Sequence, residues 1–177
     1  IKIYRLGYYQ GNGARLIADL GTYTGVAQPA PLYDVPTGKT DCDNWSPSAS
    51  WTTTGAVSGL YLAKLTRAGG GSSHIAFVVR DDSRTAAILF NTSDATWQAY
   101  NGYGGNSLYV NNSGTSVPGF NHATKVSYNR PFTTRGGGGG SGSSEDWLFN
   151  AEYPMIRWLE RNGYDVSYTT DVDMDRD

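Results

Sequence analysis

The stretch of sequence that decides the fold reads GLYLAKLT and occupies residues 59–66. Its apolar residues alternate along the run, which is typical of a half-buried strand with Leu60 and Leu62 facing the core. Similar short runs, separated by glycine- and proline-rich clusters, occupy residues 1–9, 51–54 and 75–80. Short strands at this spacing favour an antiparallel β-sandwich. We therefore expect a β-sandwich-like domain over residues 1–80, with its natural start upstream of Ile1.

The pattern changes after residue 81. Residues 86–90 read AAILF, a continuous apolar run typical of a strand covered on both faces. Residues 125–128 fit either a second strand or a turn, and residues 164–169 predict a further strand. These strands are too few to cover a helix, and the chain ends shortly after the last of them. We therefore expect residues 81–177 to form the N-terminal part of an α/β domain that continues in the natural protein.

A helix is predicted over residues 147–162. The sequence SSED at residues 143–146 fits a capping box, and Gly163 supplies the stop. At about 100° per residue, one face of this helix carries an apolar stripe, formed by Leu148, Ala151, Met155, Ile156 and Leu159. Because Pro154 lacks a backbone N–H, the helix should kink or restart immediately after Glu152. The glycine- and serine-rich residues 135–144 predict a flexible surface loop before it.

Glu152 falls inside this apolar stripe. A carboxylate buried without a partner costs several kcal/mol, so its position requires an explanation. Three interpretations remain open from the residues alone. Glu152 forms an ion pair with an arginine such as Arg130 or Arg157, it serves as a metal ligand or catalytic group, or it is exposed at a frayed turn.

Composition excludes several classes of function. The 177 residues carry a net charge of −2 with four lysines and ten arginines, so there is no basic stripe for nucleic acid. No apolar run approaches the roughly 18 residues that a membrane span requires. The single cysteine, Cys42, excludes an intramolecular disulfide framework and a zinc site built from several cysteines. The abundance of Gly, Ser, Thr, Asn and Tyr favours a secreted bacterial protein over a cytoplasmic one.

Aromatic residues gather between residues 97 and 128. Those in the first part of this region either stack sugars in a cleft or pack together, and they are Trp97, Tyr100, Tyr103 and Tyr109. Tyr100 lies on the loop expected at the carboxyl end of the apolar strand, and Tyr128 ends the next candidate strand. Ligands of open α/β sheets bind outside the carboxyl ends of strands. Two phenolates and a carboxylate are hard oxygen donors that suit ferric iron.

Five segments, in this order, resemble the large (beta) subunit of bacterial N,N-dimethylformamidase and its relatives. They are YRLGYY at 4–9, GNGAR at 11–15, WQAYN at 97–101, YNRP at 128–131, and a stretch over 152–166 that contains EYPM, WLE and GYDV. The resemblance covers nearly the whole chain. It implies a β-sandwich joined to an α/β domain of glutamine-amidotransferase-like or flavodoxin-like type.

The resemblance also implies an activity. Enzymes of this kind hydrolyse N,N-dimethylformamide to dimethylamine and formate with one iron, held by two tyrosines and one glutamate. Carried over by motif, the metal ligands are Tyr100, Tyr128 and Glu152, with Tyr103 as the substitute for the first tyrosine. The cofactor would be mononuclear ferric iron, acting as a Lewis acid. The residues expected to contact the small amide substrate are Asn101, Tyr103, Asn129 and Arg130. No general base is identified.

Two departures from the family pattern favour an alternative function. Asn150 stands where the enzyme carries a histidine, two residues before the glutamate. The relatives also continue past the final strand with further acidic and histidine residues. The alternative is a secreted structural or binding module that keeps the family fold without catalysis. The enzyme of this family has a small partner subunit, so the protein partners to expect are such a subunit and further copies of this chain.

Overall fold

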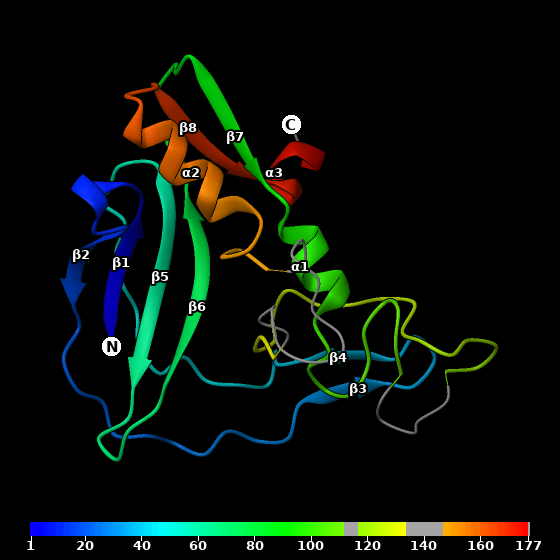
Figure 1. The fold of residues 1–177 in the computed structure, drawn as a ribbon. Helices are drawn as coiled ribbons and strands as arrows, with labels where there is room; N and C mark the ends of the chain where they lie inside the picture. Colours follow the sequence, from blue (N-terminus) through cyan, green and yellow to red (C-terminus); the bar gives the residue numbers. More distant parts are fainter. Residues whose placement is uncertain (112–116, 134–146, 177) are drawn as a thin grey trace. The chain divides into compact units, whose positions relative to one another are not determined.

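The computed structural model describes residues 1–111, 117–133 and 147–176. The chain forms two compact units that alternate along the sequence. Unit 1 comprises Ile1–Thr24, Ala49–Ser93 and Ala151–Asp177, and unit 2 comprises Gly25–Ser48 and Asp94–Asn150. The elements are mostly strands, with three α-helices among the described residues (Figure 1), which confirms the mixed class expected from the sequence. The expected domain boundary after residue 80 stays a prediction.

Unit 1 is built on a four-stranded antiparallel sheet with the order β2-β1-β5-β6 (Figure 1). Its strands are β1 (Lys2–Leu6), β2 (Ala14–Asp19), β5 (Gly59–Thr66) and β6 (Ser72–Val79). The bounds of β5 are those predicted from its alternating pattern. β5 and β6 pair along their whole length, from Gly59↔Val79 to Thr66↔Ser72. A 3₁₀ turn, η1 (Tyr9–Gly11), lies between β1 and β2.

The core of unit 1 covers both faces of β5. Leu60 and Leu62 are buried as predicted, but Tyr61 on the opposite face is buried completely. Tyr61 packs against Trp51 and Phe77, with ring centroids 5.7 and 5.6 Å away. The strand predicted over residues 51–54 is therefore wrong. Its apolar residue Trp51 packs on the sheet, while the backbone makes a turn closed by the N–H of Ala56 on the carbonyl of Thr53.

A second sheet in unit 1 pairs β7 (Ile88–Thr92) with β8 (Val166–Thr170) in parallel, in the register Ile88↔Val166. The two strands correspond to those predicted over residues 86–90 and 164–169. Burial of the first strand on both faces was a wrong expectation, because Leu89 is 59% exposed. Among the described residues β7 pairs with β8 only, which leaves its other edge without a covering strand. The short helix α3 (Asp171–Arg176) follows β8 directly.

The helix α2 (Glu152–Arg161) begins five residues later than predicted. Pro154 lies in its first turn, where a missing N–H leaves no helical hydrogen bond unmade. The helix therefore starts at Glu152 instead of passing through a kink there. The predicted apolar stripe is divided: Ile156 and Leu159 are buried on α2, Met155 is half exposed, and Leu148 is buried before the helix begins.

The described residues of unit 2 contain little regular structure. Its elements are β3 (Leu32–Asp34), β4 (Lys39–Asp41) and α1 (Asp94–Tyr100), with β3 and β4 paired antiparallel. Residues 125–128, which fitted a strand or a turn, form neither strand nor helix. The loop predicted over residues 135–144 and the capping box at 143–146 lie outside the described residues. In the part of the chain that the structure describes, no helix is long and apolar enough to cross a membrane.

Candidate functional site

The two tyrosines predicted as metal ligands both lie in unit 2. Tyr100 is the last residue of α1, because the helix continues through the segment where a loop was expected. Tyr128 lies in the irregular segment that precedes Pro131 and does not end a strand. The expected loop at Tyr100 and the expected strand end at Tyr128 are therefore wrong. Their positions depend on the contacts of these two segments.

Tyr128 is fixed by a buried carboxylate. Its phenolic O–H donates a hydrogen bond of 2.8 Å to Oδ2 of Asp94, the first residue of α1, which is 6% exposed. Tyr100 ends the same helix, so the Cα atoms of Asp94 and Tyr100 are about 9 Å apart along the axis. The Tyr100 ring stacks on Tyr109 with centroids 4.5 Å apart.

Asn129, a predicted substrate contact, joins the Tyr128 segment to the residues that follow β4. Its side-chain amide donates to Asp43 at 2.7 Å and to Asp41 at 3.4 Å, and its carbonyl accepts the N–H of Cys42 at 2.8 Å. Burial alone would raise the pKa of Asp41. Hydrogen bonds from Ser127, the Asp43 N–H and Lys39 outweigh burial and lower it. The ionised Asp41 therefore holds this segment in place.

Arg130 and Asn101, two further predicted substrate contacts, hold the loops of unit 2 together. Arg130 is 7% exposed, and its guanidinium donates to four backbone carbonyls, those of Gln98, Tyr103, Asn106 and Ser127. Burial lowers the pKa of Arg130 to about 10, so it stays charged at neutral pH. Asn101 is fully buried, donates to the Pro131 carbonyl at 2.9 Å and accepts the Thr133 N–H at 3.1 Å. Direct contact of either residue with substrate stays a prediction.

Tyr103, the substitute first ligand, lies beside the buried thiol of Cys42. Burial, followed by the charge of Cys42, raises the pKa of Tyr103. Burial and the neighbouring Asp41 likewise raise the pKa of Cys42. A phenol with a raised pKa gives up its proton less readily, and a metal binds the phenolate. Its role as the substitute ligand stays a prediction.

Glu152, the predicted carboxylate ligand, belongs to unit 1 and is the first residue of α2. It is 4% exposed, which excludes the interpretation of an exposed side chain at a frayed turn. Its Oε1 accepts the backbone N–H of Ser93 at 3.1 Å. Arg157, one of the arginines considered as its partner, donates to the carbonyl of Gly11. Neither unit by itself contains all three predicted ligands.

The described residues contain no group of three or more His, Cys, Asp or Glu side chains that could hold a metal ion. The roles of Tyr128 and Glu152 as metal ligands stay a prediction.

One family model matches the whole chain, residues 1–177, and it describes the C-terminal part of N,N-dimethylformamidase beta subunit-like proteins. The chain belongs to this family. The resemblance drawn from the five sequence segments is confirmed. No curated protein matches the chain.

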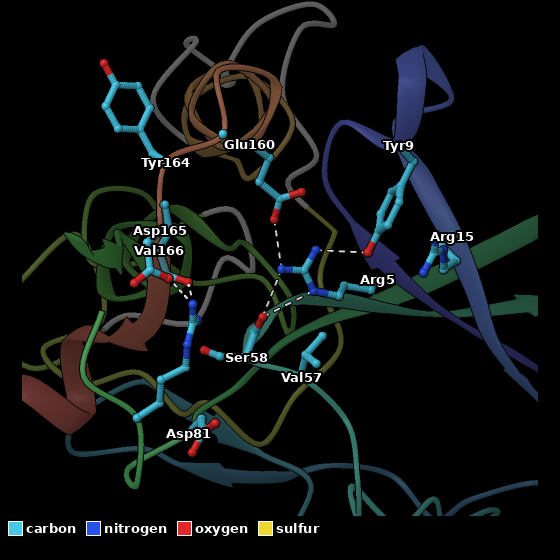
Figure 2. A pocket seen from close by; sticks show the side chains of 12 residues that line it. Arg5, Tyr9, Arg15, Val57, Ser58, Asp81, Glu160, Tyr164, Asp165 and Val166 are labelled. Carbon is cyan, nitrogen blue, oxygen red and sulfur yellow. Dashed lines mark hydrogen bonds and ion pairs between the residues drawn. The ribbon is translucent and has the colours of Figure 1, made fainter. Parts of the chain in front are cut away.

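In this member of the dimethylformamidase beta subunit-like family, unit 1 also holds a pocket that the sequence did not predict. The pocket has a volume of about 510 Å³ (Figure 2), and Arg5 lies at its centre. The Arg5 guanidinium forms an ion pair of 2.8 Å with Glu160 and donates to Tyr9 Oη at 2.9 Å. It also donates to the carbonyl of Ser58 at 2.9 and 3.2 Å. Arg5 is only 9% exposed, and Glu160 compensates its charge.

Glu160 completes this network from α2. It accepts hydrogen bonds from the Tyr168 O–H at 3.0 Å and from the Tyr8 N–H at 3.2 Å. Burial and the charge of Glu160 raise the pKa of Tyr168 above its ordinary value. Burial opposes the charge of Arg5, but Glu160 outweighs burial and raises the pKa of Arg5. One signal in the sequence could have indicated the network, since Arg5 shares a strand face with the buried Ile3.

Two glycines make room for the Arg5–Glu160 pair. A Cβ atom on Gly7 would collide with the Glu160 carboxylate, and a Cβ atom on Gly59 would collide with the Arg5 guanidinium. Neither glycine adopts a positive φ, so backbone conformation does not require glycine at these positions. The lack of space for a Cβ atom does. The glycine after β1 and the first residue of β5 therefore leave the space that the ion pair occupies.

Proposed function

We propose that this chain belongs to an iron-dependent amide hydrolase, which cleaves a small amide into an amine and a carboxylate in the manner of N,N-dimethylformamidase. One observation carries the proposal beyond family membership. Glu152 accepts the N–H of Ser93, and Tyr128 donates to Asp94. Ser93 and Asp94 are consecutive residues. Each of these two proposed ligands thus bonds, within its own unit, to one of two consecutive residues, which supports the proposal.

The donor set fits ferric iron. Two phenolates and a carboxylate provide three hard oxygen ligands, and such ligands suit a hard cation. When bound, the iron would act as a Lewis acid toward the amide carbonyl or a water molecule.

The residues of the chain would orient these ligands and move one proton. The Ser93 N–H holds Oε1 of Glu152, which fixes the carboxylate at the start of α2. Oδ2 of Asp94 lies 2.8 Å from the Tyr128 phenol and would accept its proton as the phenolate forms. Asn129 and Arg130 hold the segment around Tyr128 through Asp41, Asp43 and backbone carbonyls. Substrate contacts by Asn101, Tyr103, Asn129 and Arg130 belong to the same proposal.

We also propose the finer architecture implied by the family. The antiparallel sheet would belong to a β-sandwich, and the parallel pair β7–β8 with α2 would belong to a glutamine-amidotransferase-like domain. A parallel pair joined through a helix is the unit from which such α/β domains are built, which supports the second assignment. We further propose that the chain binds a small partner subunit and further copies of itself.

The alternative function is a secreted structural or binding module without catalysis. Asn150 favours it, because this residue replaces the histidine of the enzyme and cannot carry a proton at neutral pH. Asn150 is exposed, and its N–H donates to the Trp147 carbonyl. The two functions differ in their need for iron.

The test is iron content, measured by elemental mass spectrometry together with the visible absorption spectrum. We expect about one iron per chain. Ferric iron bound by tyrosinate should also give an absorption band in the visible range. Tyr128→Phe should weaken or shift this band, and Glu152→Gln should lower the iron content at least tenfold. Tyr23→Phe, a change at an exposed tyrosine, is the matched control and should leave both unchanged. A folded, colourless protein without iron would overturn the hydrolase proposal in favour of the module.

A further inference from the structure

We propose that the pocket of unit 1 binds a small organic carboxylate, held by the guanidinium of Arg15. This inference does not depend on the proposed function, because the pocket lining includes none of the three proposed iron ligands. It rests on the pairing of β1 with β2, on the backbone of η1 and on the charge balance of the lining.

The first observation is a cross-strand pair of arginines. Arg5 on β1 lies directly opposite Arg15 on β2. Directly opposed residues of an antiparallel pair point to the same face, and like charges in these positions repel each other. Glu160 compensates Arg5 at 2.8 Å. In the described part of the chain no ion pair includes Arg15, so the second cation of this pair has no carboxylate partner.

The second observation is the strained turn that places Tyr9 between these arginines. Tyr9 and Gln10 have φ values of 43° and 56°, a left-handed conformation that residues other than glycine rarely adopt. Strain of this kind concentrates at ligand sites. The Tyr9 ring lies 4.8 Å from Cζ of Arg15 and 5.9 Å from Cζ of Arg5 (Figure 2). The turn thus holds the Arg15 guanidinium over an aromatic face at the pocket.

The third observation is the balance of the other charges. Arg84 pairs with Asp165 and also donates to the Val166 carbonyl at 3.1 Å. Asp81 accepts the N–H and the hydroxyl of Ser83, and Figure 2 shows it on the side of the pocket away from Arg15. Near Arg15 the pocket therefore offers one uncompensated positive charge.

The dimensions and lining indicate the ligand class. A guanidinium presents paired N–H donors that match the two oxygens of a carboxylate. The pocket volume of about 510 Å³ lies within the range of small-molecule sites. Val57, which also lines it, is 62% exposed and can cover an apolar body. The ligand is thus a carboxylate attached to a small hydrocarbon or aromatic group.

The experiment is an NMR titration of the labelled protein with phenylacetate, with phenylacetamide as the neutral analogue of the same shape. We expect saturable shifts at residues 5–16 and 57–58 with phenylacetate, and at least tenfold weaker binding of phenylacetamide. Arg15→Gln should weaken phenylacetate binding at least tenfold, and Arg15→Lys should weaken it less. Arg67→Gln, at an exposed arginine between β5 and β6, is the matched control and should leave binding unchanged.

Several outcomes would overturn the proposal. Equal binding of phenylacetate and phenylacetamide would show that the charge is not recognised. Unchanged binding in Arg15→Gln, or no binding to the wild-type protein, would exclude Arg15 as the anchor. Tighter binding of inorganic phosphate than of phenylacetate would replace the carboxylate with a phosphate ligand. If Arg15→Gln fails to fold, the phenylacetate affinity of Arg15→Lys relative to the wild type provides the comparison, and unchanged affinity there together with equal binding of phenylacetamide would overturn the proposal.

Discussion

Unit 1 and unit 2 are each stabilised internally by a different kind of hydrogen bond. In unit 1, backbone groups of β1, β2, β5 and β6 pair with one another, and apolar side chains fill the core between them. In the part of unit 2 that the structure describes, most of the backbone has no strand partner. Buried polar side chains take over that task, with Arg130 alone serving four carbonyls. Since buried backbone groups must be paired, irregular segments depend on individual side chains to an extent that strands do not.

This difference bears on function, because unit 2 carries both proposed tyrosine ligands. Loops hold functional groups accurately only when neighbouring side chains lock them in place. The contacts of Asp94, Asn129 and Arg130 supply that support around Tyr128. Variants that remove one contact at a time can therefore test whether unit 2 depends on single side chains more than the sheet of unit 1 does.

The largest loss of stability is expected in unit 1, at the buried ion pair between Arg5 and Glu160. Glu160→Ala removes the partner of Arg5 and leaves a buried charge, which should cost about 3–5 kcal/mol of unfolding free energy. Urea unfolding followed by circular dichroism measures the loss. Glu160→Gln, which keeps a hydrogen-bond acceptor, is the control and should lose less. A loss below 1 kcal/mol in Glu160→Ala would show that the pair is not important for unit 1.

A smaller but more local loss is expected from unit 2. Arg130→Met leaves four carbonyls without their donor and should cost about 2–4 kcal/mol. Near-ultraviolet circular dichroism should change, because Trp97 and Trp147 pack edge to face in this unit with centroids 5.7 Å apart. Arg67→Met is the control at an exposed arginine. If the near-ultraviolet signal stays unchanged, unit 2 does not depend on Arg130 and the contrast between the units fails.

A change of one methyl group tests how tightly the ion pair is enclosed. Gly59→Ala should cost about 1–3 kcal/mol, because the new Cβ atom collides with the Arg5 guanidinium and the side chain must move. Gly69→Ala, where a Cβ atom would meet nothing within 4 Å, is the matched control. Equal melting temperatures for the two variants would mean that Arg5 has room to shift.

The smallest effect concerns the pH dependence of unit 2. The pKa of Asp41 is lowered in the folded state, because hydrogen bonds outweigh burial. Its contribution to stability is therefore present above the unfolded pKa of about 3.9 and is lost as the pH falls through the lower folded value. The stability difference between the wild type and Asp41→Asn should shrink as the pH falls from 5 to 2. A difference that is constant over this range would contradict the role of the charge.

Prediction from the sequence succeeded where periodicity decides the structure. The bounds of β5 follow from alternation alone, and the parallel strands β7 and β8 were located to within about two residues. Trp51 shows the limit in unit 1, because its apolar character reflects packing on the sheet and not membership of a strand.

In unit 2 the sequence predicted residues but not their surroundings. Arg130 and Asn101 were recognised as polar residues of a motif and interpreted as substrate contacts. Their hydrogen bonds to backbone carbonyls and amides connect segments about 30 residues apart and have no period. Glu152 was correctly identified as a carboxylate that needs a partner, but a backbone amide such as that of Ser93 leaves no signal in a sequence.

The parallel pairing of β7 with β8 has a consequence for the order of folding. Residues 93–165 lie between the two strands, and closing a flexible loop of that length costs about 4 kcal/mol in chain entropy. Contacts at such separation form late and slow the overall rate. The hairpin of β5 and β6, which is closed by a short turn, should form first and present the surface on which β8 docks. A slow refolding phase should therefore report on β8, and a nascent chain should hold its N-terminal sheet well before residues 166–170 arrive.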